Sequence, residues 1–82
     1  MVTTLTLYNK ASSAGYWAYR VNLNKVHISG MSLCIKDISD DDAKVLIDDL
    51  MQHDIRSERS RDIDGNYILK IFLHLPIECK FA

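Results

Sequence analysis

Alternating apolar and polar residues indicate two β-strands in the first part of the chain. In residues 2–8, Leu5 and Leu7 alternate with polar neighbours, and between residues 16 and 24 the odd positions from Trp17 to Leu23 are apolar. A period of two places each set on one face of a strand, and the residue types favour strands. The alternation moves from odd to even positions at residues 24–25, which predicts a tight hairpin turn at Asn24 because a side chain cannot change faces within a regular strand.

A third strand follows, and the pattern leaves one of its features open. Val26 and Ile28 continue the even set, whereas Met31, Leu33 and Ile35 return to odd positions. Gly30 lies at this second change of parity. Glycine permits either a β-bulge or a second turn there, and the sequence does not decide between them.

The segment from Ser39 to Gln52 has the periodicity of an amphipathic helix. Ser39 is a typical N-cap, and three aspartates in the first turn suit the positive end of the helix macrodipole. The apolar stripe expected to face the sheet consists of Ala43, Leu46, Ile47, Leu50 and Met51. The side chains expected to point outward are Asp41, Lys44, Val45, Asp48, Asp49 and Gln52.

The C-terminal third of the chain predicts a hairpin. Residues 56–63 are mostly polar and fit either an edge strand or a loop. Asp64–Gly65 is typical of a type I′ turn. In the final run the odd positions from Tyr67 to Leu75 are apolar, and apolar residues also occur on the even positions. This segment is therefore expected to be a central strand whose pairing ends at Pro76.

These elements predict one compact α+β domain over residues 1–82. The expected architecture is an antiparallel sheet of four to five strands with one amphipathic helix packed on one face, in the order β-β-β-α-β-β. A chain of this length has room for one core. If the uncovered face exposes apolar side chains together, two copies could form a homodimer there. The residues of this candidate patch are Tyr16, Ala18, Ile68 and Phe72.

The net charge of −1 conceals an uneven distribution of charged residues. Seven aspartates lie between Asp37 and Asp54, where Lys44 is the only basic residue, whereas residues 56–61 carry a net charge of +2. The two cysteines are too few for a disulfide scaffold, and the N-terminus does not have the pattern of a signal peptide. The longest near-apolar run contains Lys70 and His74, which argues against a membrane span. The composition thus predicts a cytoplasmic protein with reduced thiols.

The search for catalytic and metal-binding motifs is negative. Of the histidines and cysteines, only His74 and Cys79 are as close as five positions, so the two ligand pairs typical of a zinc site are missing. A calcium loop beginning at Asp62 would need a glutamate at position 73, which is leucine. No phosphate-binding or nucleophile motif occurs. We therefore predict a protein that is not an enzyme and that holds no metal or cofactor.

The acidic helix carries the functional hypothesis. Capping explains the aspartates of its first turn but not Asp48 and Asp49, because aspartate is a poor residue for the middle of a helix. Together with Asp41, these two residues surround the apolar Val45. Carboxylates around an apolar centre suit docking onto a basic protein surface, although a merely solvated helix face would show the same charges. The predicted partner-binding residues are Asp41, Val45, Asp48 and Asp49.

The partner expected from this charge pattern is a protein with a basic surface, such as one that handles nucleic acid, which the chain would inhibit or regulate. In its small size, its Asp-rich helix and its lack of catalytic motifs, the chain is similar to phage and mobile-element inhibitors such as anti-CRISPR and anti-restriction proteins. This similarity rests on general character and on no specific motif. The alternative is a small nucleic-acid-binding module that uses Arg56, Arg59 and Arg61. Against that alternative, the isoelectric point is about 6.2.

Overall fold

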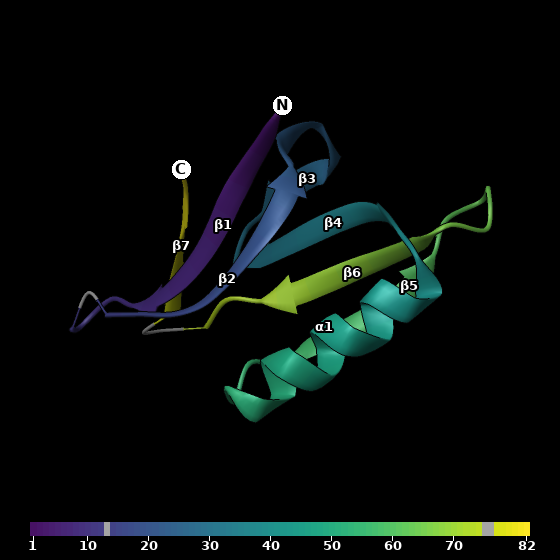
Figure 1. Cartoon of the computed structure of the whole chain (residues 1–82). Coiled ribbons are helices and arrows are strands. Elements are labelled where there is room, and N and C mark those ends of the chain that lie inside the picture. Colours follow the sequence, from purple (N-terminus) through teal and green to yellow (C-terminus); the bar gives the residue numbers. More distant parts are fainter. Residues whose placement is uncertain (13, 75–76) are drawn as a thin grey trace.

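The computed structural model describes residues 1–12, 14–74 and 77–82, and within them the chain forms two antiparallel sheets and one α-helix (Figure 1). The elements are β1 (Val2–Asn9), β2 (Ala14–Asn22), the 3₁₀ turn η1 (Leu23–Lys25), β3 (Val26–Ser29), β4 (Ser32–Ile38), α1 (Asp40–Gln52), β5 (Ser57–Arg61), β6 (Tyr67–Phe72) and β7 (Ile77–Phe81). Sheet A has the strand order β2-β1-β7, and sheet B has the order β3-β4-β6-β5. The predicted α+β class, with one helix packed on an antiparallel sheet, is confirmed.

The structure has more strands than the sequence pattern suggested. Instead of four to five strands in one sheet, the described residues form seven strands in two sheets. The hairpin turn predicted at Asn24 is wrong, because η1 connects β2 of sheet A to β3 of sheet B and these strands do not pair. The largest difference lies in the final run, which the pattern predicts as one central strand. It divides into β6, which is central in sheet B, and β7, which pairs with β1 in sheet A. Leu75 and Pro76, where the pairing was expected to end, lie outside the described residues.

Gly30 makes a turn and not a bulge. Ser29 pairs with Ser32, so Gly30 and Met31 form a two-residue hairpin loop between β3 and β4. Gly30 has a φ of +58°, the left-handed region in which a side chain is disfavoured. A glycine with positive φ at the first loop position matches the type II′ turn, whose twist suits a two-residue hairpin.

The hairpin between β5 and β6 is present, but its predicted type I′ turn is wrong. Gly65 has a φ of +84°, whereas Asp64 is not among the residues with positive φ, as a type I′ turn would need. The carboxylate of Asp62 instead accepts hydrogen bonds from the N–H groups of Asp64 and Asn66 at 2.9 and 3.0 Å. These bonds favour a longer loop with glycine at its left-handed position. Residues 57–61 form an edge strand, which was one of the two alternatives.

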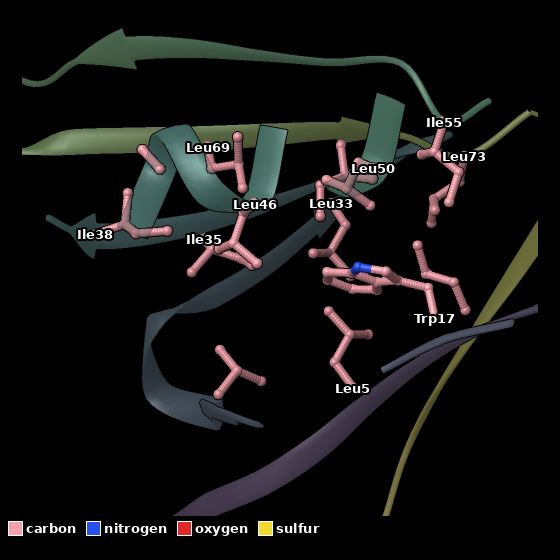
Figure 2. Close-up of a cluster of buried hydrophobic side chains, with 14 residues drawn as sticks. Leu5, Trp17, Leu33, Ile35, Ile38, Leu46, Leu50, Ile55, Leu69 and Leu73 are labelled. Atoms are coloured by element: carbon pink, nitrogen blue, oxygen red, sulfur yellow. The ribbon is translucent and has the colours of Figure 1, made fainter. Parts of the chain in front are cut away.

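The core lies between the two sheets and the helix. The odd-numbered side chains of β1 and β2 face those of β4 and β6, and Trp17 of sheet A lies between Leu5, Leu33 and Leu50 (Figure 2). Leu5, Leu33 and Leu50 have no exposed surface, and Trp17 is 5% exposed. The odd-numbered apolar residues of β1, β2 and β4 thus share one core between two sheets, whereas Leu23 and Met31 of the same odd pattern lie outside these strands and are exposed.

Helix α1 packs on the half of sheet B formed by β5 and β6 (Figure 1). Its apolar stripe behaves largely as predicted, because Ala43, Leu46 and Leu50 are buried and Ile47 is half-buried. Met51 is the exception, with 65% of its surface exposed. The apolar stripe is therefore one residue longer than the part of it that packs against the core.

Candidate protein-binding surface on helix α1

The N-terminus of α1 forms as the sequence predicted. The Ser39 hydroxyl accepts a hydrogen bond from the N–H of Asp42 at 3.1 Å. Asp40, Asp41 and Asp42 occupy the first turn, where unpaired N–H groups and the macrodipole favour negative charge. Local capping chemistry thus explains why three acidic residues begin this helix.

The C-terminus of α1 ends in a Schellman motif. Ile55 N–H donates to Leu50 O at 2.9 Å, and Asp54 N–H donates to Met51 O at 3.1 Å. Asp54 adopts a φ of +57°, at the position where glycine is the usual residue. Ile55 is 2% exposed and returns the chain to the core beside Leu50. The helix is therefore fixed at both ends, which holds its outer surface in a defined orientation.

One carboxylate of the first turn is neutralised within the molecule. Asp40 lies 3.2 Å from Lys44 Nζ and 2.5 Å from Arg59 Nη1 of strand β5. Its pKa is lowered, chiefly by the hydrogen bond with Lys44 and further by the nearby charges of Lys44 and Arg59. Asp40 thus ties the helix to the edge of sheet B and adds little to an exposed negative surface.

Asp49 does not point outward as the helical spacing predicted. It is half-buried, and its carboxylate accepts a hydrogen bond from the indole N–H of Trp17 on β2. A buried indole N–H needs an acceptor, and a mid-helix aspartate beside sheet A supplies it. The sequence showed that capping could not explain Asp49, but it did not show that β2 would lie beside this side of α1. On the same side, burial raises the pKa of Tyr19, and the charge of Asp42 raises it further.

The residues that remain on the solvent side form one strip along α1. Asp41, Val45 and Asp48 are exposed and follow one another at helical spacing, with Gln52 one turn further on. Val45 is 68% exposed. Asp48 accepts a hydrogen bond from Gln52 Nε2 at 3.3 Å. We call Asp41, Val45, Asp48 and Gln52 the outward strip; it contains three of the four predicted partner-binding residues.

A hollow between α1 and β5 borders the outward strip. It comprises two adjoining cavities of about 300 and about 480 Å³, which share Ile47 and Met51 in their walls. Asp48 and Lys44 line the larger cavity from the helix, and Arg59 lines it from β5. The hollow thus places the apolar side chains of Ile47 and Met51 next to the exposed carboxylate of Asp48. Helical periodicity did not indicate this hollow, because it places Met51 in the buried stripe.

The three arginines of the alternative nucleic-acid site do not form one patch. Arg59 and Arg61 lie over the ring of Tyr67 at 4.7 and 4.8 Å, on the side of sheet B that carries α1. Arg56 lies over Phe72 at 5.3 Å. Phe72 belongs to the even positions of β6, which face away from the helix. Strand alternation therefore separates Arg56 from the other two.

The predicted homodimer patch is also divided. Ala18 is exposed on β2 of sheet A, whereas Ile68 and Phe72 are half-buried on β6 of sheet B. The side chain of Tyr16 lies outside the described part of the structure. The patch was expected because the sequence pattern had assigned these strands to a single sheet.

The thiols and acidic groups show no clustered site. Within the described residues, no group of three histidine, cysteine, aspartate or glutamate side chains could hold a metal ion. Cys34 and Cys79 are free thiols, and burial raises the pKa of Cys79, which disfavours the reactive thiolate at neutral pH. In the same part of the chain, no helix has the length and apolar character needed to cross a bilayer.

No protein-family model, no curated protein and no solved structure matches this chain.

Proposed function

We propose that this protein binds a partner protein with a basic surface through the outward strip of α1, and that it inhibits or regulates that partner by covering the surface. The observation that carries the proposal is the exposed pair Asp41 and Asp48 on either side of Val45. The described contacts give neither carboxylate a cation of the same chain. Charges presented in this way steer a cationic partner and fix its orientation.

Two surroundings of the strip support a docking role. The hollow beside Asp48 offers Ile47 and Met51 as apolar contact area, and a binding surface needs such area because exposed ion pairs contribute little by themselves. The two helix caps and the Asp40–Arg59 ion pair fix α1 on sheet B, so little order has to be gained on binding.

The class of partner follows from the charge. Surfaces that bind nucleic acid are rich in lysine and arginine, and carboxylates on a helix can occupy the positions that phosphates would take. Asp49 is left out of the proposed contact, because its carboxylate already binds Trp17. The proposed docking residues are Asp41, Val45 and Asp48.

The test compares baits that differ in the position of one charge reversal. Wild type, D48K and D41K/D48K are immobilised and exposed to lysate, and the captured proteins are identified by mass spectrometry. D64K is the matched control, because Asp64 is exposed in the loop between β5 and β6 and does not belong to α1. We expect basic proteins captured by wild type and D64K to be lost from D48K and D41K/D48K, and wild-type capture to weaken as salt is raised. Equal capture by wild type and D41K/D48K would refute the proposal.

A further inference from the structure

Strand β7 has one side that no other strand of the described residues pairs. It is an edge of sheet A, next to β1 and on the opposite side of β1 from β2 (Figure 1). An unpaired edge offers main-chain N–H and C=O groups to another strand, and folded proteins usually blunt such edges with like charges, proline or a covering element. The residues of β7 show whether this edge is blunted.

The pairing with β1 identifies which main-chain groups face the free side. Thr4 and Ala82 exchange two hydrogen bonds, of 2.8 and 3.0 Å. Antiparallel pairs alternate between bonded and non-bonded, so Glu78 and Lys80 direct their main-chain groups toward β1. The main-chain groups of Ile77, Cys79 and Phe81 are therefore directed toward the free edge.

The sequence of this edge is complementary to itself. If a second copy of β7 lies antiparallel to the first, centred on Cys79, then Ile77 faces Phe81 of the second copy. In the same register Glu78 faces Lys80 of that copy, and Lys80 faces its Glu78. Opposite charges and apolar pairs placed directly across two strands stabilise their pairing. We propose that the protein forms a symmetric dimer through antiparallel pairing of β7 with β7 of a second copy.

The hydrogen bonds available for this pairing can be counted. Three residues on each copy face the edge, so a full register would use six N–H donors. The N–H of Ile77 already donates to His74 O at 2.7 Å in its own chain. Subtracting this donor from each copy leaves four main-chain hydrogen bonds across the dimer axis. The side chains of Ile77, Cys79 and Phe81 are half-buried against the core, and the second copy would cover more of them.

The charged pair on the other face of β7 is already positioned. Glu78 accepts the hydroxyl hydrogen bond of Tyr8 at 2.5 Å, and this bond, together with burial and the nearby charge of Glu78, raises the pKa of Tyr8 to about 12. The Nζ atom of Lys80 lies 4.9 Å from the centre of the Tyr8 ring. In the proposed register Glu78 and Lys80 would form non-hydrogen-bonded pairs, in which opposing side chains are closest. Both side chains are held on this face of β7 by contacts within their own chain, which for Glu78 include Lys10 at 3.9 Å.

Strand β5, an edge of equal length in sheet B, shows that the complementarity of β7 is not general. Its sequence is Ser-Glu-Arg-Ser-Arg, and antiparallel self-pairing about its centre would place Arg59 opposite Arg59. Like charges in direct opposition are destabilising, and they are a common means of blocking edge pairing. The proposed dimer uses β7, an edge of sheet A. It is independent of the proposed function, because α1 packs on sheet B.

The decisive experiment uses two opposite charge reversals of the full chain. Sedimentation equilibrium of wild type over a wide concentration range is expected to show a monomer–dimer equilibrium. K80E and E78K, each alone, place like charges across the axis and should raise the dimer dissociation constant by about tenfold or more. An equimolar mixture of K80E and E78K restores every opposite pair and should form a heterodimer, which also shows that both variants fold. K36E is the matched control, because Lys36 is exposed on β4 of sheet B.

A thiol crosslink tests the register. In a pair centred on Cys79, the two Cα atoms would be about 5.5 Å apart, which a disulfide can span. Diamide would oxidise the two thiols to a disulfide and take up their two electrons and two protons. Wild type and C34S should yield a covalent dimer, and C79S should not. The proposal is overturned if wild type is monomeric at every concentration, if K36E weakens the dimer as much as K80E, if the mixture fails to associate, or if the crosslink forms through Cys34.

Discussion

Asp48 and Asp49 are neighbours in the sequence, but helix α1 turns their side chains toward different surroundings. Asp49 is half-buried and accepts the indole N–H of Trp17, whereas Asp48 is exposed and contacts Gln52 of the same helix. Successive helical residues are rotated by about 100°, which is enough to place one carboxylate against sheet A and the other in solvent. A cluster of aspartates in a sequence therefore does not measure the negative charge of a surface.

The first turn shows the same division. Asp40 is paired with Lys44 and Arg59, whereas the exposed Asp41 has no such ion pair among the described contacts. Two of the five aspartates of α1, Asp40 and Asp49, thus hold the helix in place, one toward each sheet. Of the other three, Asp42 is exposed beside Tyr19 of sheet A, and Asp41 and Asp48 lie on the solvent side, where the proposed function needs them. Substitutions on the two sides should separate stability from binding.

The largest effect is expected for D49A. Removing the carboxylate leaves the Trp17 indole N–H without its acceptor, and an unsatisfied buried donor costs about 1–3 kcal/mol in the free energy of unfolding. Urea denaturation, followed by the fluorescence of the only tryptophan, measures this loss and reports directly on the affected residue.

The matched variant D49N separates the hydrogen bond from the charge. Asparagine keeps an acceptor oxygen at the same position, so D49N should be more stable than D49A, although less stable than wild type because the charge assistance is lost. If D49A unfolds at the same urea concentration as wild type, the Trp17–Asp49 bond contributes nothing and Asp49 returns to the set of candidate docking residues.

A smaller, pH-dependent effect is expected for Asp40. Its pKa is lowered from the ordinary value of 3.8, first by the hydrogen bond with Lys44. A carboxyl whose pKa is lower in the folded state adds stability above the unfolded value, and this stability is lost as the pH falls through the folded pKa. Urea midpoints of wild type and D40N should therefore differ at neutral pH and converge below about pH 4. Curves that stay parallel throughout acidification would contradict the role of this ion pair.

The sequence pattern was sufficient for the local elements of the molecule. Alternation identified the extended segments before α1 and most of their inward residues, although Leu23 and Met31 are exposed and the third segment is divided into β3 and β4. The Ser39 cap and the apolar stripe identified the helix. These predictions succeed because period-two and period-3.6 patterns follow from side-chain direction alone. The same reasoning failed for Asp49, because its partner Trp17 lies 32 positions away in the chain and periodicity says nothing about which strand passes beside a helix.

The pattern of apolar and polar residues could not predict the division into two sheets, for a similar physical reason. The final run is apolar on odd positions from Tyr67 onward, which is compatible with one long strand or with two strands that share an inward face. What separates them is the pairing of β7 with β1, a contact between the two ends of the chain. The free edge of β7, and with it the proposed dimer, could not be predicted until that pairing was known.

The smallest effect on stability is expected for D48N. This variant also gives the most direct comparison between Asp48 and Asp49. Asp48 is exposed on the outward strip and receives only the Gln52 amide at 3.3 Å, so its substitution should change the free energy of unfolding by no more than about 0.5 kcal/mol. D48N and D49N make the same chemical change at adjacent positions, and equal effects on urea midpoints would remove the structural distinction between them.

Under the proposed function, D48N should also reduce capture of a basic partner and lower the salt dependence of that capture, since one charge has left the contact. Loss of binding in the variant that keeps its stability would assign Asp48 to recognition, while its neighbour Asp49 holds the helix against sheet A.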